Sequence, residues 1–253
     1  MYGWRARIGM LVPSVNTCSE PQFQQLSPPG VSFYTTRLPL NGGGVEQLRR
    51  MTDGLEDAVR LLLDVNPDLI LFHCTAGSMA GPAGYDQAIA ARIEAAAGRP
   101  ATTTASGVLA GLRALDARRI VLVTPYVSAT NEAERTFLEG SGLEVVGLHG
   151  LELASGNAYV RVQPEEWYRI VREAVAEAAA PPDAVLVSCT NIRVLDVIAR
   201  LEADLGLPLV TSNQAAVWYC LRRLGLPDTL PGYGRLLAEI QALPAPEAVA
   251  AGR

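Results

Sequence analysis

The sequence predicts an α/β fold with two similar lobes related by pseudo-twofold symmetry. Each lobe is expected to be a short parallel sheet flanked by helices, with the active site in the cleft between the lobes. Two observations support this fold class. Short, uniformly apolar segments alternate with segments of helical periodicity, as expected for parallel strands that are buried on both faces. Motifs in the first half of the 253-residue chain also recur, in the same order, in the second half.

Five apolar segments are the predicted strands: Ile8–Val12, Leu69–Phe72, Ile120–Val123, Val185–Val187 and Leu209–Val210. Between the first two, the segment Val45–Val65 has apolar side chains at helical spacing, so a helix is expected there. Strands that alternate with helices in this way form parallel sheets covered on both sides.

Four motif pairs, each separated by about 110 residues, indicate an internal repeat. "NPDLILFHCT" resembles "PPDAVLVSCT", "ARIGMLVP" resembles "RRIVLVTP", and "GRPATTTAS" resembles "GLPLVTSNQ", and the segments that follow this last pair share Leu-Arg-x-Leu. We therefore expect an N-terminal α/β lobe at residues 1–115 and a C-terminal α/β lobe at 116–225. Residues 226–253 are expected to pack back on the body and to end in a poorly ordered tail.

Composition restricts the partners. The formal net charge of −5 argues against nucleic acid binding. The N-terminal apolar segment is too short for a signal peptide or a membrane span, so no membrane partner and a cytoplasmic location are expected. The chain has no lysine, which excludes a Schiff-base or phosphate-loop lysine, and its four cysteines show no CxxC pair. No cofactor and no metal are expected.

Cys74 and Cys189 are the candidate reactive groups, because both occupy the same place in the repeat, directly after a strand. Ligand sites of parallel sheets form at the carboxyl ends of strands, so facing lobes would bring both thiols to one cleft. Backbone N–H groups and a helix N-terminus there would favour thiolates. The neighbouring Thr75, Ala76 and Thr190 offer hydroxyls and amides suited to a carboxylate.

Two thiols on opposite faces of a small carboxylate permit two kinds of reaction. One thiolate can remove a proton while the other thiol returns a proton on the far side, which gives racemisation. Alternatively, one thiolate adds to an activated double bond, the new single bond rotates, and elimination gives the other geometric isomer. Neither reaction needs a cofactor.

The motifs "IGMLVPSVNT", "FHCTAGSM", "GLRALDARRIVLVTPY", "SGNAYVRVQPEE", "SCTN" and "PGYGRL" span Ile8 to Leu236. With them, the chain resembles the aspartate/glutamate racemase superfamily, and within it the branch of maleate cis-trans isomerases and arylmalonate decarboxylases. The Cys-Thr-Asn that begins at Cys189 is more similar to amino-acid racemases and ectoine-utilisation proteins.

The resemblance to maleate isomerases implies that the Cys74 thiolate forms a succinyl-type covalent adduct and that Cys189 is the partner acid or base. Asn16, in a Val-Pro-Ser-x-Asn motif, would hold a substrate carboxylate, with Tyr126 and Asn157 also at the site. Arylmalonate decarboxylases keep only the second cysteine, so Cys74 disfavours their reaction. The predicted substrate-binding residues are Asn16, Ser14, Thr75, Ala76, Tyr126, Asn157, Thr190 and Asn191.

The predicted function is therefore cofactor-independent cis-trans isomerisation of a small unsaturated dicarboxylate, of the maleate-to-fumarate type, by a protein expected to form a homodimer. The alternatives are a two-cysteine racemase of an Asp, Glu or hydantoin-type substrate, an arylmalonate-type decarboxylase, and a carboxylate-binding protein without catalysis. For single residues, simpler roles also exist. Asn16 could cap a helix that begins near Ser19, and His73, Cys18 and Cys220 are expected to be packing residues.

Overall fold

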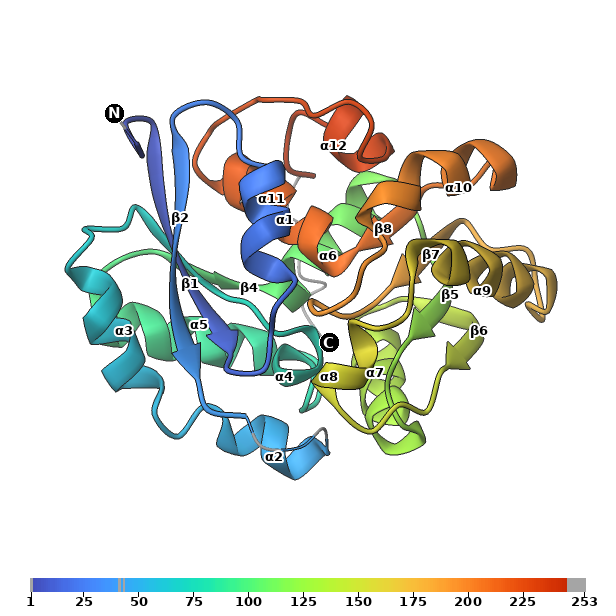
Figure 1. Cartoon of the computed structure of the whole chain (residues 1–253), viewed down its shortest axis with the longest axis horizontal. Helices are drawn as coiled ribbons and strands as arrows, with labels where there is room; N and C mark the ends of the chain where they lie inside the picture. The colour runs from blue at the N-terminus through green and yellow to red at the C-terminus, as the bar shows by residue number, and fades with distance from the viewer. Residues whose placement is uncertain (1, 41, 43, 245–253) are drawn as a thin grey trace, which may run out of the picture.

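The computed structural model describes residues 2–40, 42 and 44–244, and it contains two four-stranded parallel sheets side by side (Figure 1). The strand order is β2-β1-β3-β4 in the first sheet and β6-β5-β7-β8 in the second. Each sheet thus repeats the same order with strands taken from one half of the chain. The predicted α/β fold with two similar parallel sheets is confirmed.

The first sheet consists of β1 (Ala6–Pro13), β2 (Val31–Leu38), β3 (Leu69–Phe72) and β4 (Ala101–Thr103). The second sheet consists of β5 (Arg119–Thr124), β6 (Glu144–Gly150), β7 (Ala184–Val187) and β8 (Leu209–Thr211). The helices of the first half are α1 (Ser19–Gln25), α2 (Val45–Arg50), α3 (Leu55–Leu63), α4 (Thr75–Ser78), α5 (Tyr85–Ala97) and α6 (Thr104–Ala114). Those that follow are α7 (Ser128–Gly140), α8 (Gly156–Tyr159), α9 (Pro164–Ala176), the 3₁₀ turn η1 (Leu195–Val197), α10 (Ile198–Leu205), α11 (Ser212–Arg223) and α12 (Arg235–Glu239).

All five predicted strands are present, and the central ones are fully buried. Every residue of β3 and of β7 is buried, because helices cover both faces of each sheet. Three strands were not predicted. The edge strands β2 and β6 are largely half-exposed and mix polar with apolar residues, and the buried β4 has threonines at two of its three positions, so none of them is a uniformly apolar segment.

The helix predicted over Val45–Val65 is interrupted. It forms α2 and α3, separated by a turn in which the Thr52 hydroxyl donates to the carbonyl of Arg49. Leu48 of α2 and Leu55 of α3 are both buried, so the break lets each segment turn its apolar side chains inward. The periodicity was interpreted correctly as helical, but it did not reveal the break.

The two lobes, meaning here the two sheets with their flanking helices, pack through α6 and α11. Each of these helices begins after a threonine that caps it: Thr103 accepts from the amide of Ser106, and Thr211 accepts from the amide of Gln214. Gly107 of α6 allows the close approach, because a Cβ atom there would lie 3.1 Å from the carbonyl oxygen of Ala215. The repeated helices thus form the contact between the lobes.

The chain after α11 returns to the body through α12, where Leu236 and Leu237 are completely buried. The indole of Trp218 donates to the carbonyl of Ile240 and fixes the segment that follows α12. The tail expected to be poorly ordered falls almost entirely outside the described residues. Among the helices that the structure describes, none has both the length and the apolar character needed to cross a bilayer.

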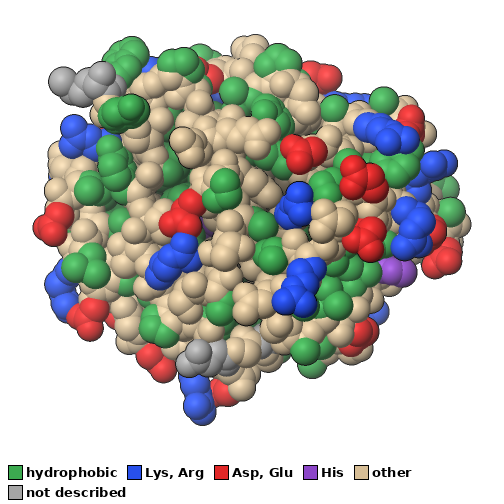
Figure 2. Space-filling view, in the orientation of Figure 1, with side chains coloured by type: hydrophobic (Ala, Val, Ile, Leu, Met, Phe, Trp, Pro, Cys, Tyr) green, Lys and Arg blue, Asp and Glu red, His purple; other side chains and the backbone are tan. Residues whose placement is uncertain are grey.

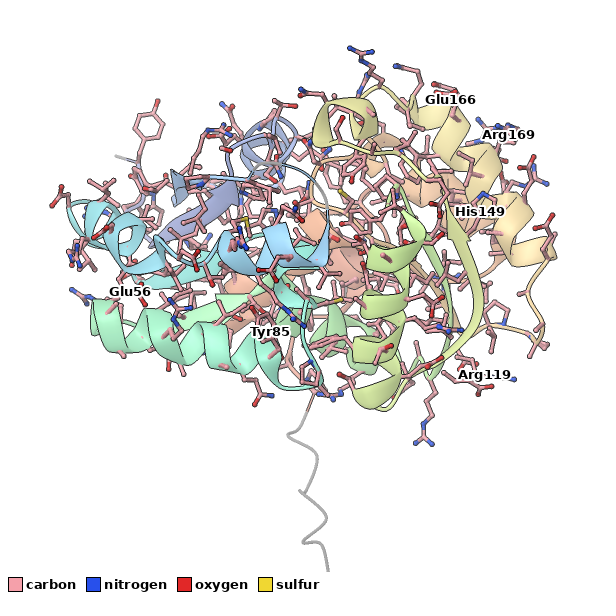
Figure 3. The ribbon with its side chains drawn as sticks, turned by 90° about the horizontal axis from the view of Figure 1, so that it is seen from below. Glu56, Tyr85, Arg119, His149, Glu166 and Arg169 are labelled. Carbon is pink, nitrogen blue, oxygen red and sulfur yellow. The ribbon has the colours of Figure 1, made fainter. Side chains whose placement is uncertain are left out.

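The outer surface carries charges of both signs. Acidic and basic side chains are interspersed over the face shown in Figure 2. In the view from below, Glu56, Arg119, Glu166 and Arg169 lie at the periphery, away from the region where the lobes meet (Figure 3). These four charged side chains therefore lie outside the region between the lobes.

Candidate active site

A cavity of about 100 Å³ lies between the lobes, near the point where α4 and α8 approach each other (Figure 1). Both Cys74 and Cys189 line it. A negative charge on Cys74 also raises the pKa of Cys189, which shows that the two sulfurs are close enough to interact electrostatically. The two cysteines of the repeat thus share one small cavity.

Cys74 lies between the end of β3 and the first turn of α4. Its backbone is extended, and its sulfur accepts a hydrogen bond of 3.3 Å from the amide of Gly77. The position of Gly77 requires a residue without a side chain, because a Cβ atom would lie 3.0 Å from the Cys74 sulfur and 2.8 Å from Cε of Met51. The glycine of the Thr-Ala-Gly-Ser segment therefore lets a backbone N–H group come close enough to hydrogen-bond to the sulfur of Cys74.

Cys189 follows β7 and has a similar donor but no helix. Its sulfur accepts a hydrogen bond of 3.3 Å from the amide of Asn191, and the next helical turn begins only at Leu195. The expectation of a helix N-terminus at both cysteines is therefore wrong for Cys189. Instead, the hydroxyl of Tyr126 lies close enough to the Cys189 sulfur to lower the pKa of that thiol. The rings of Tyr126 and Tyr159 pack edge to face with centroids 5.7 Å apart.

Burial controls the protonation of both thiols. Cys74 is 6% exposed and Cys189 is 5% exposed. Burial raises the pKa of each thiol to about 12, and the single amide donor at each sulfur offsets only part of this effect. The expectation that both cysteines favour the thiolate is therefore wrong, because desolvation outweighs the backbone donors.

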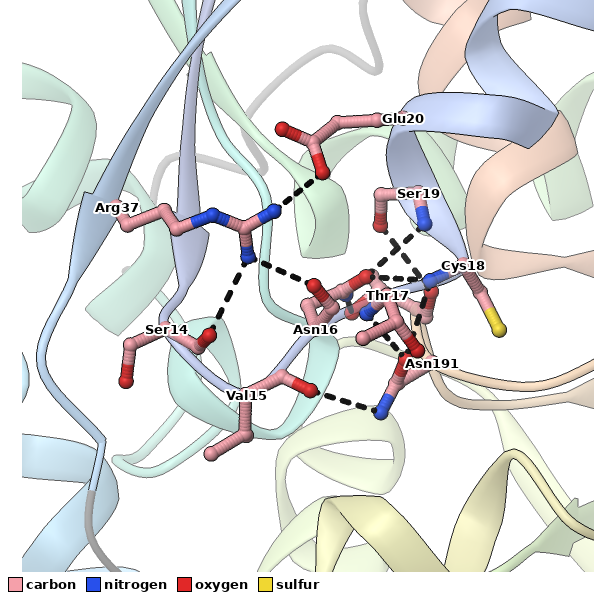
Figure 4. A network of polar contacts seen from close by, with 10 residues as sticks. Ser14, Val15, Asn16, Thr17, Cys18, Ser19, Glu20, Arg37 and Asn191 are labelled. Carbon is pink, nitrogen blue, oxygen red and sulfur yellow. Dashed lines mark hydrogen bonds and ion pairs between the residues drawn. The ribbon is translucent and has the colours of Figure 1, made fainter.

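Asn16 and Asn191 join the two lobes beside the cavity (Figure 4). The Asn16 side chain accepts from the amides of Cys18 and Ser19 and donates to the Thr190 hydroxyl at 3.0 Å. The Asn191 side chain accepts from the amides of Thr17 and Cys18, as Figure 4 shows, and donates to the Gly156 carbonyl at 3.0 Å. Asn16 thus hydrogen-bonds to the backbone at the start of α1, although the N-cap position itself is Cys18, and it also lines the cavity.

The structure places eight of the ten predicted site residues on the cavity wall: Cys74, Cys189, Asn16, Ala76, Tyr126, Asn157, Thr190 and Asn191. The other two, Ser14 and Thr75, are not among the lining residues. The Ser14 hydroxyl accepts from the amide of Leu40, and the Thr75 hydroxyl donates to Ser212 at 2.7 Å. Both side chains thus hold segments that carry lining residues.

Several lining residues were not among the ten predicted site residues. Pro13, Val15, Leu40, Leu48, Ser155 and Tyr159 complete the wall together with Gly42 and Gly156. Leu40 and Leu48 come from the segment after the edge strand β2, and Tyr159 ends α8, so no strand-end motif pointed to them. None of these residues is charged. A carboxylate in the cavity would therefore meet amides, hydroxyls and apolar side chains.

The remaining cysteines and His73 are buried packing residues. Cys18 and Cys220 are buried, and His73 is completely buried with both ring nitrogens hydrogen-bonded, to Thr104 and Asn213 at 2.9 Å each. Burial lowers the pKa of His73 to about 3, so its ring is neutral. Within the described ranges, no three His, Cys, Asp or Glu side chains are grouped so that they could hold a metal ion.

Comparison with known proteins identifies the family. The family model described as arylmalonate decarboxylase matches residues 8–237. The chain belongs to the arylmalonate decarboxylase family. It is 32% identical to the maleate isomerase of Nocardia farcinica over 94% of this chain and 98% of that protein. It is also 31% identical to the arylmalonate decarboxylase of Bordetella bronchiseptica over 92% of this chain and 96% of that protein.

Solved structures of family members have the same fold. A cysteine-to-serine mutant of the Nocardia farcinica maleate cis-trans isomerase, with a covalently bound succinylcysteine intermediate, matches with a TM-score of 0.85 at 29% identity. The match covers 92% of this chain and 98% of that chain. A maleate isomerase variant from Pseudomonas putida S16 with maleate matches with a TM-score of 0.84 at 26% identity, covering 92% and 97% of the two chains. The arylmalonate decarboxylase family thus includes members that isomerise maleate and members that decarboxylate arylmalonates.

Proposed function

We propose that the protein is a cofactor-independent cis-trans isomerase of a small unsaturated dicarboxylate, of the maleate-to-fumarate type. The observation that carries this proposal is the pair of cysteines, Cys74 and Cys189, on one cavity small enough for a four-carbon diacid. The relatives support it, since the isomerases from Nocardia farcinica and Pseudomonas putida S16 were solved with a succinylcysteine intermediate and with maleate.

The reaction begins with the thiolate of Cys74, after its proton has left to solvent. The thiolate sulfur forms a bond to one olefinic carbon, and the π electrons move to the neighbouring carbon, where the adjacent carboxylate delocalises the charge. The thiol of Cys189 gives its proton to that carbon. The product of this half-reaction is a succinyl adduct on Cys74, with a thiolate on Cys189.

The adduct contains a single bond where the substrate had a double bond, so its two halves can rotate. The thiolate of Cys189 then removes a proton from the same carbon. The electron pair re-forms the double bond while the carbon–sulfur bond to Cys74 breaks. Protons and electrons balance over the cycle, and both cysteines regain their initial states without a cofactor.

The neutral wall is suited to a dicarboxylate that must change shape. The Asn16 amide, the Thr190 hydroxyl and the exposed Asn157 all line the cavity, and Asn16 and Thr190 are hydrogen-bonded to each other. We assign Asn16 and Asn157 to the two carboxylates and Tyr126 to Cys189, whose thiolate its hydroxyl stabilises. The absence of charged residues from this wall lets a carboxylate move during rotation without breaking an ion pair.

Intact-mass spectrometry with maleate tests the proposal. In a Cys189→Ala variant, water must replace the Cys189 thiol in giving the proton that completes the adduct on Cys74, and no thiolate is left to remove that proton efficiently, so the mass is expected to increase by one molecule of maleic acid. A Cys74→Ala variant is the matched control and should gain no mass, while Cys220→Ala should isomerise maleate like the wild type. If the wild type produces no fumarate and the Cys189→Ala variant gains no mass, the proposal is wrong.

Racemisation uses the same two sulfurs and therefore remains the second candidate. The Cys-Thr-Asn sequence at Cys189 favours it. Deuterium exchange at the α-carbon of aspartate or glutamate, measured in D₂O, separates the two activities, because addition to maleate does not involve an amino acid. A cytoplasmic location and assembly as a homodimer stay predictions.

A further inference from the structure

Glu134 is a buried carboxyl group with no hydrogen-bond partner. It lies in α7 and is 1% exposed. Among the described residues, neither of its carboxyl oxygens has a hydrogen-bonding partner, and no arginine forms an ion pair with it. An ionised carboxylate in such a place is costly, so native proteins rarely keep one without a function.

Ser188 is a polar residue close enough to this carboxyl to affect its pKa. It directly precedes Cys189, and its buried hydroxyl also has no hydrogen-bonding partner among the described residues. Ser188 lowers the pKa of Glu134, although the two groups do not reach ordinary hydrogen-bond geometry. Burial is the larger effect and raises that pKa to about 7. The equivalent residue of the other lobe, His73, is hydrogen-bonded at both nitrogens. In the part of the chain that the structure describes, an unsatisfied polar pair therefore lies behind Cys189 and not behind Cys74.

Glu134 is linked to the cavity through its own helix. Asn131, one turn earlier on the buried face of α7, donates to the carbonyl of Tyr126 at 3.0 Å and so holds the residue that contacts Cys189. A negative charge on Glu134 raises the pKa of both Cys74 and Tyr126. The carboxyl does not line the cavity, yet its charge reaches both sides of it.

The other charged groups near α7 face outward. Glu132 and Arg135 of the same helix are exposed and pair with each other. On the elements packed against α7, the ionisable side chains are exposed or half-exposed: Glu46, Arg49 and Arg50 of α2, and Glu144 and His149 of β6. The ionisable interior groups whose pKa the charge of Glu134 affects are Cys74 and Tyr126.

We propose that Glu134 is a positioning residue that controls thiolate formation at Cys74: its carboxyl must be protonated for the thiolate to form readily, and its ionisation suppresses the thiolate. The proposal rests on the proposed function in one respect, the nucleophilic role of Cys74. Physically, two negative charges in one dry region repel each other, so the proton on Glu134 allows the sulfur to give up its own.

This arrangement predicts an unusual pH dependence for Cys74. At pH values below its pKa, an isolated thiol has a thiolate fraction that increases about tenfold for each unit by which the pH rises. In the wild type, the gain should be smaller over the range in which Glu134 loses its proton. In Glu134→Gln, which has the same shape and no charge, the gain should stay about tenfold per unit throughout.

The experiment is alkylation of the full-length protein with iodoacetamide from about pH 5.5 to about pH 9, with the rate at Cys74 resolved by peptide mass spectrometry. The ratio of Glu134→Gln to wild-type rate constants is expected to be near one at the acidic end and to rise toward about tenfold at the alkaline end. Glu139→Gln, an exposed carboxyl on the same helix, is the matched control and should follow the wild type.

Superimposable Cys74 profiles for the wild type and a folded Glu134→Gln variant would overturn the proposal. If Glu134→Gln does not fold, the wild-type profile alone decides the question. A logarithm of the Cys74 alkylation rate that rises with pH at a constant slope would also overturn the proposal. The readout does not depend on isomerase activity. A wild type that alkylates as expected but forms no fumarate would therefore refute the proposed function and leave the role of Glu134 intact.

Discussion

The hydroxyl of Thr75 donates a hydrogen bond of 2.7 Å to the hydroxyl of Ser212, in the other lobe. Ser212 also accepts from the amide of Cys189 at 3.1 Å. One buried serine hydroxyl thus connects the residue after the first cysteine to the backbone of the second. This contact crosses the lobe interface and fixes the separation of the two sulfurs.

Ser212→Ala should destabilise the protein more than Thr75→Val, because it leaves both the Thr75 hydroxyl and the Cys189 amide without a partner. Each buried group left unsatisfied costs about 1–3 kcal/mol of the free energy of unfolding. Urea titration of both single variants and the double variant measures the coupling, expected at about 0.5–3 kcal/mol. Additive effects of the two substitutions would show that this hydrogen bond does not connect the lobes.

Gly77→Ala should impair turnover by displacing a sulfur. The new Cβ atom would be too close to the end of the Met51 side chain, which can move aside, and would lie 3.0 Å from the Cys74 sulfur. The sulfur can make room only by leaving its reactive position. Misplacement of a reacting group by about 1 Å can cost about a hundredfold in rate, so kcat for maleate should fall by about tenfold to a hundredfold. Gly54→Ala, where a Cβ atom meets nothing within 4 Å, should leave kcat unchanged. Equal kcat values for the two variants would contradict the role of Gly77.

Tyr126→Phe removes the hydroxyl that contacts Cys189 and keeps the ring that packs against Tyr159. The hydroxyl stabilises the Cys189 thiolate, and hydrogen bonds to charged groups contribute about 1.5–3 kcal/mol. Steady-state kinetics should therefore show kcat lowered by about tenfold to a hundredfold with little change in KM. A rise in KM at constant kcat would instead indicate that the hydroxyl binds substrate.

The stability of the protein should decrease as pH rises through neutrality, because of Glu134. Its pKa is about 7 in the folded protein against an ordinary 4.5, so the folded state binds this proton more tightly. The resulting stability is fully present below about pH 4.5 and is lost as pH rises through about 7. The loss is about 3 kcal/mol of the free energy of unfolding.

Denaturant titrations at several pH values measure this loss. Glu134→Gln carries no titrating group at the site, so its free energy of unfolding should lack this component and exceed that of the wild type at alkaline pH. An equal pH dependence in both proteins would mean that the carboxyl finds a compensating partner on ionisation.

The central strands and the two cysteines could be predicted from local sequence. β3 and β7 are buried on both faces and must be uniformly apolar, and the cysteine after each follows directly along the chain. Because the repeat was visible, a common cavity for Cys74 and Cys189 followed from symmetry and the rule that ligands bind at strand carboxyl ends.

The edge strands β2 and β6 and half of the cavity wall could not be predicted in this way. β2 and β6 are half-exposed, so their side chains need not be apolar and the alternation signal is lost. Leu40, Leu48 and Tyr159 reach the cavity from loops and short helices, and their positions depend on how the lobes pack.

By itself, then, the sequence determined the strand-and-helix alternation, the repeat and the presence of one thiol per lobe, because these depend on burial patterns along the chain. Only the tertiary structure decided the environment of those thiols. Their raised pKa values arise from desolvation by both lobes together. The position of Glu134 is decided in the same way: its segment is rich in charged residues like a surface helix, and only packing shows that this carboxyl faces inward.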